Sequence, residues 1–111
     1  MDKVLGMLGM AKKAGRICSG SFLCEKAVKC GESRLVIIAS DASDNAKKAI
    51  INSCRYYNVE YIEYSEMELL GKFTGSGKRA VVSVNDDNFA AAIMKKLHQG
   101  YIERNGENGS F

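Results

Sequence analysis

A glycine-rich segment at residues 73–79, Phe-Thr-Gly-Ser-Gly-Lys-Arg, comes closest in composition to a phosphate-binding motif. A P-loop needs a glycine five residues before its Gly-Lys pair and a serine or threonine after it. In this chain those two places hold Lys72 and Arg79. A P-loop also opens a helix, whereas this segment leads into an apolar run that starts at Ala80. Nucleotide hydrolysis is therefore not predicted, and we interpret the segment as a basic loop able to contact a polyanion.

No other group of residues combines a nucleophile with a base. His98 is the only histidine, and the apolar spacing around it places it on the polar side of a helix, with no carboxylate or cysteine at helical spacing. Ser40, Asp41 and Ser43 have no base beside them in the sequence, and helix capping accounts for Asp41 and Ser43. The protein is therefore predicted not to be an enzyme.

The four cysteines, at positions 18, 24, 30 and 54, are six or more residues apart. Structural zinc sites favour pairs about two to four residues apart, so neither a metal nor another cofactor is predicted. The N-terminus begins a helical pattern without the apolar stretch of a signal peptide, and no apolar run reaches the roughly 20 residues of a membrane span. We expect buried or half-buried thiols in a cytoplasmic protein without a membrane partner.

Apolar spacing and turn residues predict alternating helices and strands over 111 residues, a length suited to one domain. Helices are expected from 4 to the stop at 15, from 20 or 21 to the stop at 31, from the cap at 43 to about 57, from 65 to about 70, and from 86–88 to the stop at 100. Strands are expected at 35–39, 59–64 and 80–84, with 16–18 as a connector or edge strand. This order predicts an α/β fold, a three-layer α/β/α sandwich around a small mixed sheet, in one domain of residues 1–100. Residues 101–111 are expected to form a disordered tail.

The predicted helices bury different stripes and begin with different caps. Ser65 with Glu68 three residues later predicts a capping box for the fourth helix, and residues 71–77 are expected to be a loop. The inward positions of the second and third helices are expected to be Leu23, Ala27 and Val28, and Ala46, Ala49, Ile50, Cys54 and Tyr57.

Basic residues gather in the first third of a chain whose net charge is +3. Residues 1–31 contain six lysines and arginines against two acids, whereas residues 60–68 contain four acids and no base. Such asymmetry is typical of nucleic-acid binders, although a solvated basic helix face is the better explanation of the charge taken alone.

Phe22 and Leu23 lie in the first turn of the second predicted helix. One interpretation is a staple that packs this turn against Met7 or the strand near residue 80. The other is an exposed apolar pair at a helix N-terminus, which can stack on an unpaired base.

The start of that helix, at Gly20, follows a short extended segment and precedes the buried strand 35–39. This order places the positive end of a helix dipole at the mouth of the sheet, where small α/β domains hold their ligands. Because lysines lie nearby and no catalytic group does, the phosphate backbone of RNA is the favoured ligand.

Three blocks of the chain carry a family resemblance, and they occur in the family's order over residues 3–97. They are Gly20-(five residues)-Lys26-Ala27-Val28 with Gly31, Leu35-Val36-Ile37-Ile38-Ala39-Ser40-Asp41, and Leu70-Gly71-Lys72-(three residues)-Ser76. In these blocks the chain resembles the kink-turn RNA-binding family of ribosomal proteins, of the L7Ae and L30e type, and within it the short bacterial YlxQ-type branch.

The resemblance implies an RNA surface made of three segments. They are the start of the second helix (Gly20, Ser21, Lys26), the turn after the buried strand (Asp41, Ala42, Ser43) and the loop before the strand at residue 80 (Gly77, Lys78, Arg79). Kink-turn binders of the family carry Asn-Glu where this chain has Phe22 and Leu23, and that pair reads the sheared G·A pairs of the kink. The resemblance therefore implies RNA binding without implying kink-turn specificity.

The sequence thus predicts a non-enzymatic RNA-binding protein, associated with ribosomes or another structured RNA, whose RNA site is completed by Phe22 and Leu23. The alternative is a protein–protein adaptor in which the same two residues form the apolar centre of a surface that docks on a ribosomal or processing factor.

Overall fold

The computed structural model of the protein describes residues 2–105. Five helices and four strands alternate along this part of the chain. In order they are α1 (Lys3–Lys13), β1 (Ile17–Ser19), α2 (Ser21–Lys29), β2 (Leu35–Ile38), α3 (Asp44–Tyr57), β3 (Tyr61–Glu63), α4 (Met67–Phe73), β4 (Val81–Val84) and α5 (Asp87–Asn105).

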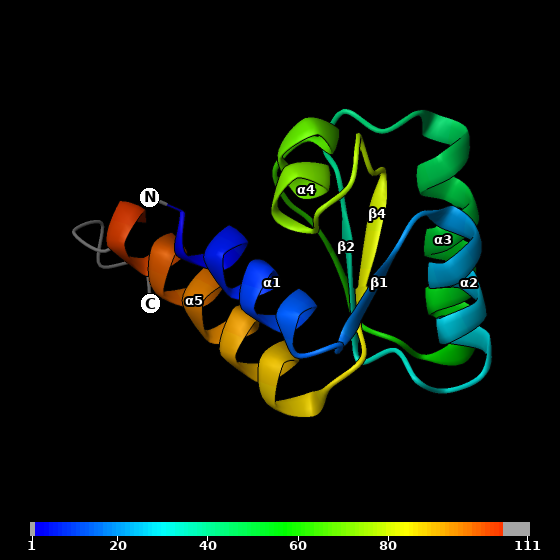
Figure 1. The fold of residues 1–111 in the computed structure, drawn as a ribbon, viewed down its shortest axis with the longest axis horizontal. Coiled ribbons are helices and arrows are strands. Elements are labelled where there is room, and N and C mark those ends of the chain that lie inside the picture. The colour runs from blue at the N-terminus through cyan, green and yellow to red at the C-terminus, as the bar shows by residue number, and fades with distance from the viewer. Residues whose placement is uncertain (1, 106–111) are drawn as a thin grey trace.

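The four strands form one sheet in the order β1-β4-β2-β3. β4 runs antiparallel to both of its neighbours, and β2 and β3 are parallel, so the sheet is mixed. Helices α1, α4 and α5 lie on one side of it and α2 and α3 on the other (Figure 1). The predicted three-layer α/β/α sandwich is confirmed, and residues 16–18 contribute to an edge strand.

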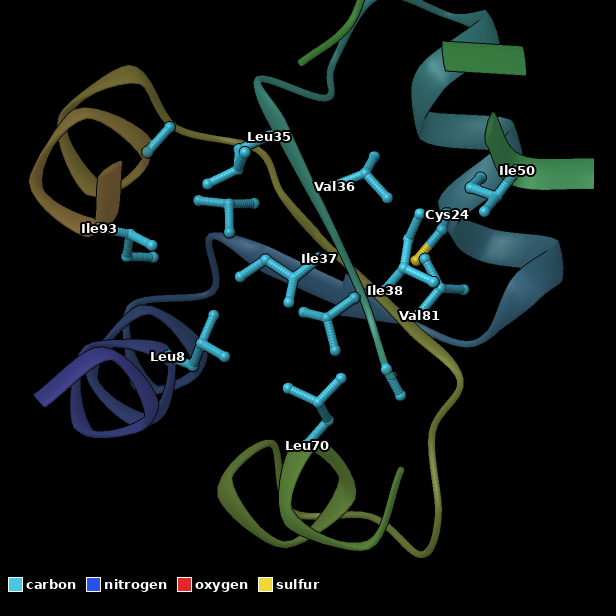
Figure 2. Packing of buried hydrophobic residues seen from close by; sticks show 14 of the residues in the cluster. Leu8, Cys24, Leu35, Val36, Ile37, Ile38, Ile50, Leu70, Val81 and Ile93 are labelled. Carbon is cyan, nitrogen blue, oxygen red and sulfur yellow. The ribbon is translucent and has the colours of Figure 1, made fainter. Parts of the chain in front are cut away.

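The two central strands, β2 and β4, are buried along their whole length because helices cover both faces of the sheet. Figure 2 shows Leu8, Leu70 and Ile93 packing on one face, and Cys24 and Ile50 on the other. All five side chains are at most 3% exposed. The continuous apolar runs that predicted these strands therefore form the centre of the core.

Two helices bury a set of side chains that differs from the predicted one. In α2 the inward position belongs to Cys24, which is fully buried, whereas Leu23 is 49% exposed, so the prediction for Leu23 was wrong. In α3 the buried pair is Ile50 and Cys54. The other two predicted positions that fail are Ala49 and Tyr57, which are exposed. A short helix that covers one face of a small sheet has room for only one or two core contacts per turn.

The start of α4 also differs from the prediction. Ser65 adopts a left-handed backbone with φ of 66° and does not cap the helix. Instead the Asp41 carboxylate accepts a hydrogen bond of 2.8 Å from the Met67 backbone N–H. The capping box was therefore wrong, because an acceptor from a distant turn takes its place. The helix also extends through Gly71 to Phe73, into the segment predicted as a loop.

The last helix does not stop at Gly100 as predicted but continues to Asn105. Residues 101–105 are therefore helical rather than part of a disordered tail, because one glycine inside a helix costs only about 1 kcal/mol. The rest of the predicted tail, residues 106–111, lies outside the described residues. None of the described helices is long and apolar enough to cross a membrane.

Candidate nucleic-acid interface

Three segments that are distant in sequence meet at one end of the sheet. The Gly20 N–H donates a hydrogen bond of 2.9 Å to the Val81 carbonyl, and the Ala39 N–H donates one of 2.8 Å to the Ala80 carbonyl. The start of α2, the turn after β2 and the loop before β4 therefore lie side by side, at the upper end of the sheet in Figure 1. We call this end, formed by residues 19–21, 39–43 and 77–81, the upper rim.

The first turn of α2 lacks a side-chain cap. Its N-cap residue is Gly20, whose φ of 93° and ψ of 150° suit glycine alone. By contrast, α1 and α3 are capped by the side chains of Asp2 and Ser43. The N-terminal N–H groups of α2 therefore keep their positive partial charge without a side-chain acceptor, a setting that favours an anion.

Phe22 and Leu23 lie at this uncapped end and point away from the core. Phe22 is 79% exposed and Leu23 is 49% exposed, so the proposed staple against the core is wrong. One turn further along, Lys26 is also exposed. Phe22, Glu25, Lys26, Lys29 and Cys30 line a shallow hollow of roughly 450 Å³ on the outer face of α2. An aromatic ring and ammonium groups thus share one open surface.

The loop before β4 is held against both neighbouring segments. Arg79 is half-buried, and its Nε donates a hydrogen bond of 3.1 Å to the hydroxyl of Ser19, directly before α2. The Arg79 backbone N–H donates one of 3.0 Å to the Met67 carbonyl. Arg79 therefore fixes the loop between α2 and α4, at the place the sequence predicted.

Lys78 is exposed and faces the α4 side of the loop. Together with Glu68, Lys72, Ser76 and Gly77 it lines a second hollow of roughly 660 Å³. Lys72 was not among the predicted site residues. The signal that points to it is its position in the last turn of α4, directly before the glycine-rich loop. The cationic surface thus extends from the rim toward α4.

The turn after β2 serves mainly to cap helices. Asp41 caps α4, as described above, and the Ser43 hydroxyl accepts a hydrogen bond of 3.1 Å from the Ala46 N–H at the start of α3. Ala42 is only 7% exposed, so its side chain is not available to a ligand. The structure places this turn at the upper rim, but its side chains are already engaged in the fold.

Several cations near the rim have no acidic partner. In the part of the chain that the structure describes, neither Lys26, Lys78 nor Arg79 takes part in an ion pair. Lys29 pairs with Glu25 at 3.2 Å, and Lys47 pairs with Glu63 at 3.3 Å. Lys26, Lys78 and Arg79 therefore remain available to an anion from solution.

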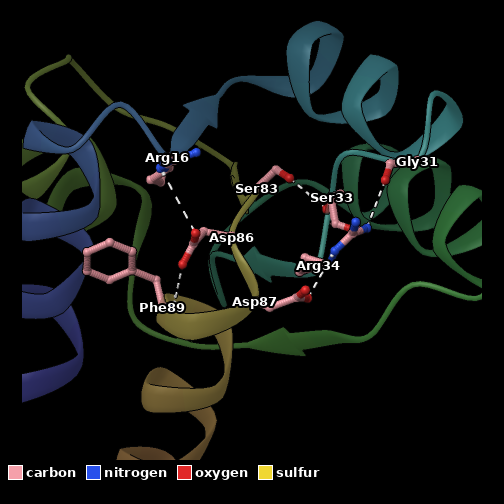
Figure 3. A network of polar contacts seen from close by, with 8 residues as sticks. All are labelled: Arg16, Gly31, Ser33, Arg34, Ser83, Asp86, Asp87 and Phe89. Carbon is pink, nitrogen blue, oxygen red and sulfur yellow. Dashed lines mark hydrogen bonds and ion pairs between the residues drawn. The ribbon is translucent and has the colours of Figure 1, made fainter.

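The opposite end of the sheet has a different electrostatic arrangement (Figure 3). Arg34 pairs with Asp87 at 3.0 Å and donates a hydrogen bond of 2.8 Å to the Gly31 carbonyl. Arg16 lies 4.0 Å from Asp86, which also accepts a hydrogen bond from the Phe89 N–H. These arginines join the start of α5 to β1 and β2, and their charges are matched by acids.

Comparison with known proteins agrees with this fold. Residues 2–95 match the ribosomal protein L7Ae/L30e/S12e/Gadd45 family. The chain is 34% identical to a Bacillus subtilis protein named RNA-binding protein YlxQ, over 82% of this chain and 91% of that one. It is 32% identical to the protein of the same name from Enterococcus faecium, over 89% and 94% of the two chains.

Two solved structures share the fold. One is a protein of unknown function from Bacillus halodurans, with a TM-score of 0.84, 30% identity, and coverage of 88% of this chain and 99% of that one. The other is a Giardia lamblia 15.5 kD RNA-binding protein, with a TM-score of 0.73, 20% identity, and coverage of 89% and 88%. The family match spans most of the chain, so the chain belongs to the ribosomal protein L7Ae/L30e/S12e/Gadd45 family.

Proposed function

We propose that this protein binds structured RNA at its upper rim and catalyses no reaction. The observation that carries the proposal is the combination of an uncapped α2 N-terminus with three nearby cations that have no acidic partner among the described residues. The names of its relatives as RNA-binding proteins support the same class of ligand. We place its action in the cytoplasm, on ribosomal or other structured RNA.

Lys26 and Lys78 would each contact a phosphate, and the first-turn amides of α2 would donate to a third. Arg79 is tied to Ser19 through its Nε, so it would hold the loop in place while its other guanidinium nitrogens face the backbone of the RNA. Such contacts fix the position and shape of an RNA but carry no base sequence. Recognition would therefore depend mainly on RNA shape.

Phe22 would add a stacking surface for an unpaired base. Its ring is exposed beside Lys26, and an aromatic side chain next to a cation is a common platform for unpaired bases. The proposed surface is completed by seven further residues, Ser21, Leu23, Asp41, Ala42, Ser43, Gly20 and Gly77. Gly20 and Gly77 contribute their backbones, and Ala42 makes no side-chain contact.

The test is the salt dependence of RNA affinity. Each of Lys26→Ala and Lys78→Ala should weaken binding by a similar factor for all RNAs and lower the slope of log K against log salt by about 0.7–0.9. Lys12→Ala is the matched control, because this exposed lysine lies in the last turn of α1, which precedes β1 at the opposite end of the sheet. An unchanged slope in Lys26→Ala and Lys78→Ala would remove both from the interface.

A gel shift that compares a kink-turn RNA with a kinkless RNA of equal length tests whether the protein prefers kink-turns. Phe22 and Leu23 stand where kink-turn binders of the family carry Asn-Glu, so we expect the two RNAs to bind about equally. A clear preference for the kink-turn would show that the sheared pairs are recognised by other groups.

A protein–protein adaptor is the second candidate function, and the exposure of both Phe22 and Leu23 favours it. In that case binding to a ribosomal or processing protein would be insensitive to salt and to nuclease. Phe22→Asp would abolish it, because a charge would enter the apolar centre of the contact. RNA binding that relies on lysines alone would hardly change in the same variant.

A further inference from the structure

The junction between β1 and α2 holds a pair of thiols that the RNA surface does not use. Cys18 is a half-buried residue of the edge strand β1, and Cys24 is fully buried in α2. Sγ of Cys18 lies 3.6 Å from the Leu23 carbonyl oxygen, and Sγ of Cys24 lies 3.6 Å from the Cys18 carbonyl oxygen. The Cys18 sulfur thus contacts the backbone of the residue before Cys24, and the Cys24 sulfur contacts the backbone of Cys18 itself. These two contacts bring the two side chains together.

A chain of hydrogen bonds from β4 ends on the Cys18 sulfur. The Ser33 and Ser83 hydroxyls are 2.6 Å apart, Ser83 Oγ lies 2.6 Å from Asn85 Oδ1, and Asn85 Nδ2 lies 3.7 Å from Cys18 Sγ. Each hydroxyl has one hydrogen to donate, and an amide oxygen only accepts. Ser83 therefore donates to Asn85 Oδ1, and Ser33 donates to the hydroxyl oxygen of Ser83. The Asn85 amide is thereby oriented with its N–H toward the sulfur. A donor held in this way stabilises negative charge on Cys18.

The ionisation of the two thiols differs accordingly. The hydrogen bond from Cys24 is the largest cause that lowers the pKa of Cys18 to about 6, and Asn85 and Ser83 act in the same direction. Burial and the charge of Glu32 oppose them. The contact with Cys18 and burial raise the pKa of Cys24. The pKa of Cys18 therefore lies below that of Cys24, so Cys18 is the thiol of the pair that ionises first.

We propose that Cys18 is a reactive thiol that peroxides oxidise, and that Cys24 is the thiol that closes a reversible disulfide with it. In the first step the Cys18 thiolate attacks one peroxide oxygen, the O–O bond breaks, and a sulfenic acid and hydroxide form. In the second step the Cys24 sulfur attacks the sulfenic sulfur, its proton leaves with the hydroxyl as water, and the S–S bond forms. The peroxide takes up the two electrons that the thiols lose.

Peroxide can reach Cys18 because this residue of the edge strand β1 is only half-buried. Cys54, the other buried thiol, lies in α3 within the core and Cys30 is exposed at the end of α2. Exposure alone would make Cys30 the first thiol to oxidise. The proposal predicts the reverse order, which makes Cys30 an internal control.

Mass spectrometry of the wild-type protein tests the proposal. Trypsin cleaves after Arg16 and Lys26 and leaves no site between them, so both thiols fall in the peptide 17–26. After limited hydrogen peroxide at pH 7 and alkylation of the remaining thiols, this peptide should be two hydrogens lighter and unalkylated, and dithiothreitol should restore both alkylation sites. Cys30 should remain alkylated in the same sample.

Two variants separate the steps. Cys24→Ala should leave a sulfenic acid at Cys18 that dimedone captures, whereas Cys30→Ser should form the disulfide as the wild type does. In the wild type, alkylation of Cys18 should level off above about pH 7, whereas an ordinary thiol continues to gain rate toward pH 9. Oxidation of Cys30 before Cys18, or a peptide 17–26 that keeps both thiols after peroxide, would overturn the proposal.

Discussion

Gly71 is the position at which adding a single methyl group has the largest expected cost. A Cβ on this residue would lie 1.6 Å from the Gly77 carbonyl oxygen and 2.5 Å from its carbonyl carbon. Real Cβ contacts essentially never fall below 3.0 Å, so α4 and the loop before β4 would have to separate by about 1.4 Å. Both groups in the clash are backbone, which no side-chain rotation can relieve.

The magnitude for Gly71→Ala follows from three terms. Forced overpacking costs about 1–3 kcal/mol. Separation of the two segments would also break the 2.8 Å hydrogen bond from the Ser76 N–H to the Gly71 carbonyl, which contributes about 0.5–1.5 kcal/mol. The higher helix propensity of alanine offsets about 1 kcal/mol of this loss. We therefore expect a net loss of about 0.5–3.5 kcal/mol in the free energy of unfolding.

Urea denaturation followed by circular dichroism measures this loss as a lower midpoint. Gly6→Ala is the matched control, because Gly6 lies inside α1 and a Cβ there would meet nothing within 4 Å. That variant should gain up to about 1 kcal/mol from helix propensity alone. If Gly71→Ala were as stable as the wild type or more stable, the close approach of α4 and the loop would be refuted. Where the variant still folds, its RNA salt slope should also fall, because the same displacement moves Lys78 and Arg79.

Three further perturbations have definite outcomes. Asp41→Ala should destabilise the protein by about 1 kcal/mol, measured by urea denaturation, because α4 loses its cap, whereas Asp41→Asn should retain most of the stability. Phe22→Ala should change stability by less than about 0.5 kcal/mol but weaken RNA affinity by about 1–3 kcal/mol in a titration, if a base stacks on the ring; an unchanged affinity would contradict stacking. Stability should also fall as pH rises from 9 to 11, because burial raises the pKa of Cys54 from 9.0 to about 11, so the unfolded chain loses this proton first. Cys54→Val should reduce that alkaline loss.

The fold was predictable where local pattern and tertiary structure agree. The strands β2 and β4 were predicted because each is a continuous apolar run, and a strand covered on both faces needs no alternation. The cap of α4 was not predicted, because its acceptor, Asp41, is 26 residues away from Met67 in the sequence. The helical state of Gly71 escaped prediction for the same reason, since only the approach of Gly77 explains a glycine there.

The location of the candidate site was predictable from the sequence, whereas the ion pairing of its lysines was less predictable. The family resemblance placed the start of α2 and the loop before β4 on one predicted surface. The pairing of Lys29 with Glu25 is local, one helical turn apart, and could be anticipated. The pairing of Lys47 with Glu63 joins α3 to β3 and depends on the sheet. Sequence alone therefore could not show which lysines remain unpaired.

The contrast between the two ends of the sheet bears on which candidate function is correct. At the lower end Arg16 and Arg34 each face an acid, and the pairs join elements of the fold. Among the described residues, Lys78 at the upper rim and Lys26 beside it take part in no ion pair, so fold stability gives no reason for their placement there. Their charge acts on a partner within a Debye length, about 8 Å at physiological salt. A polyanion would be bound by these lysines and released by salt. An apolar docking partner would instead contact Phe22 and would make no contact with the lysines.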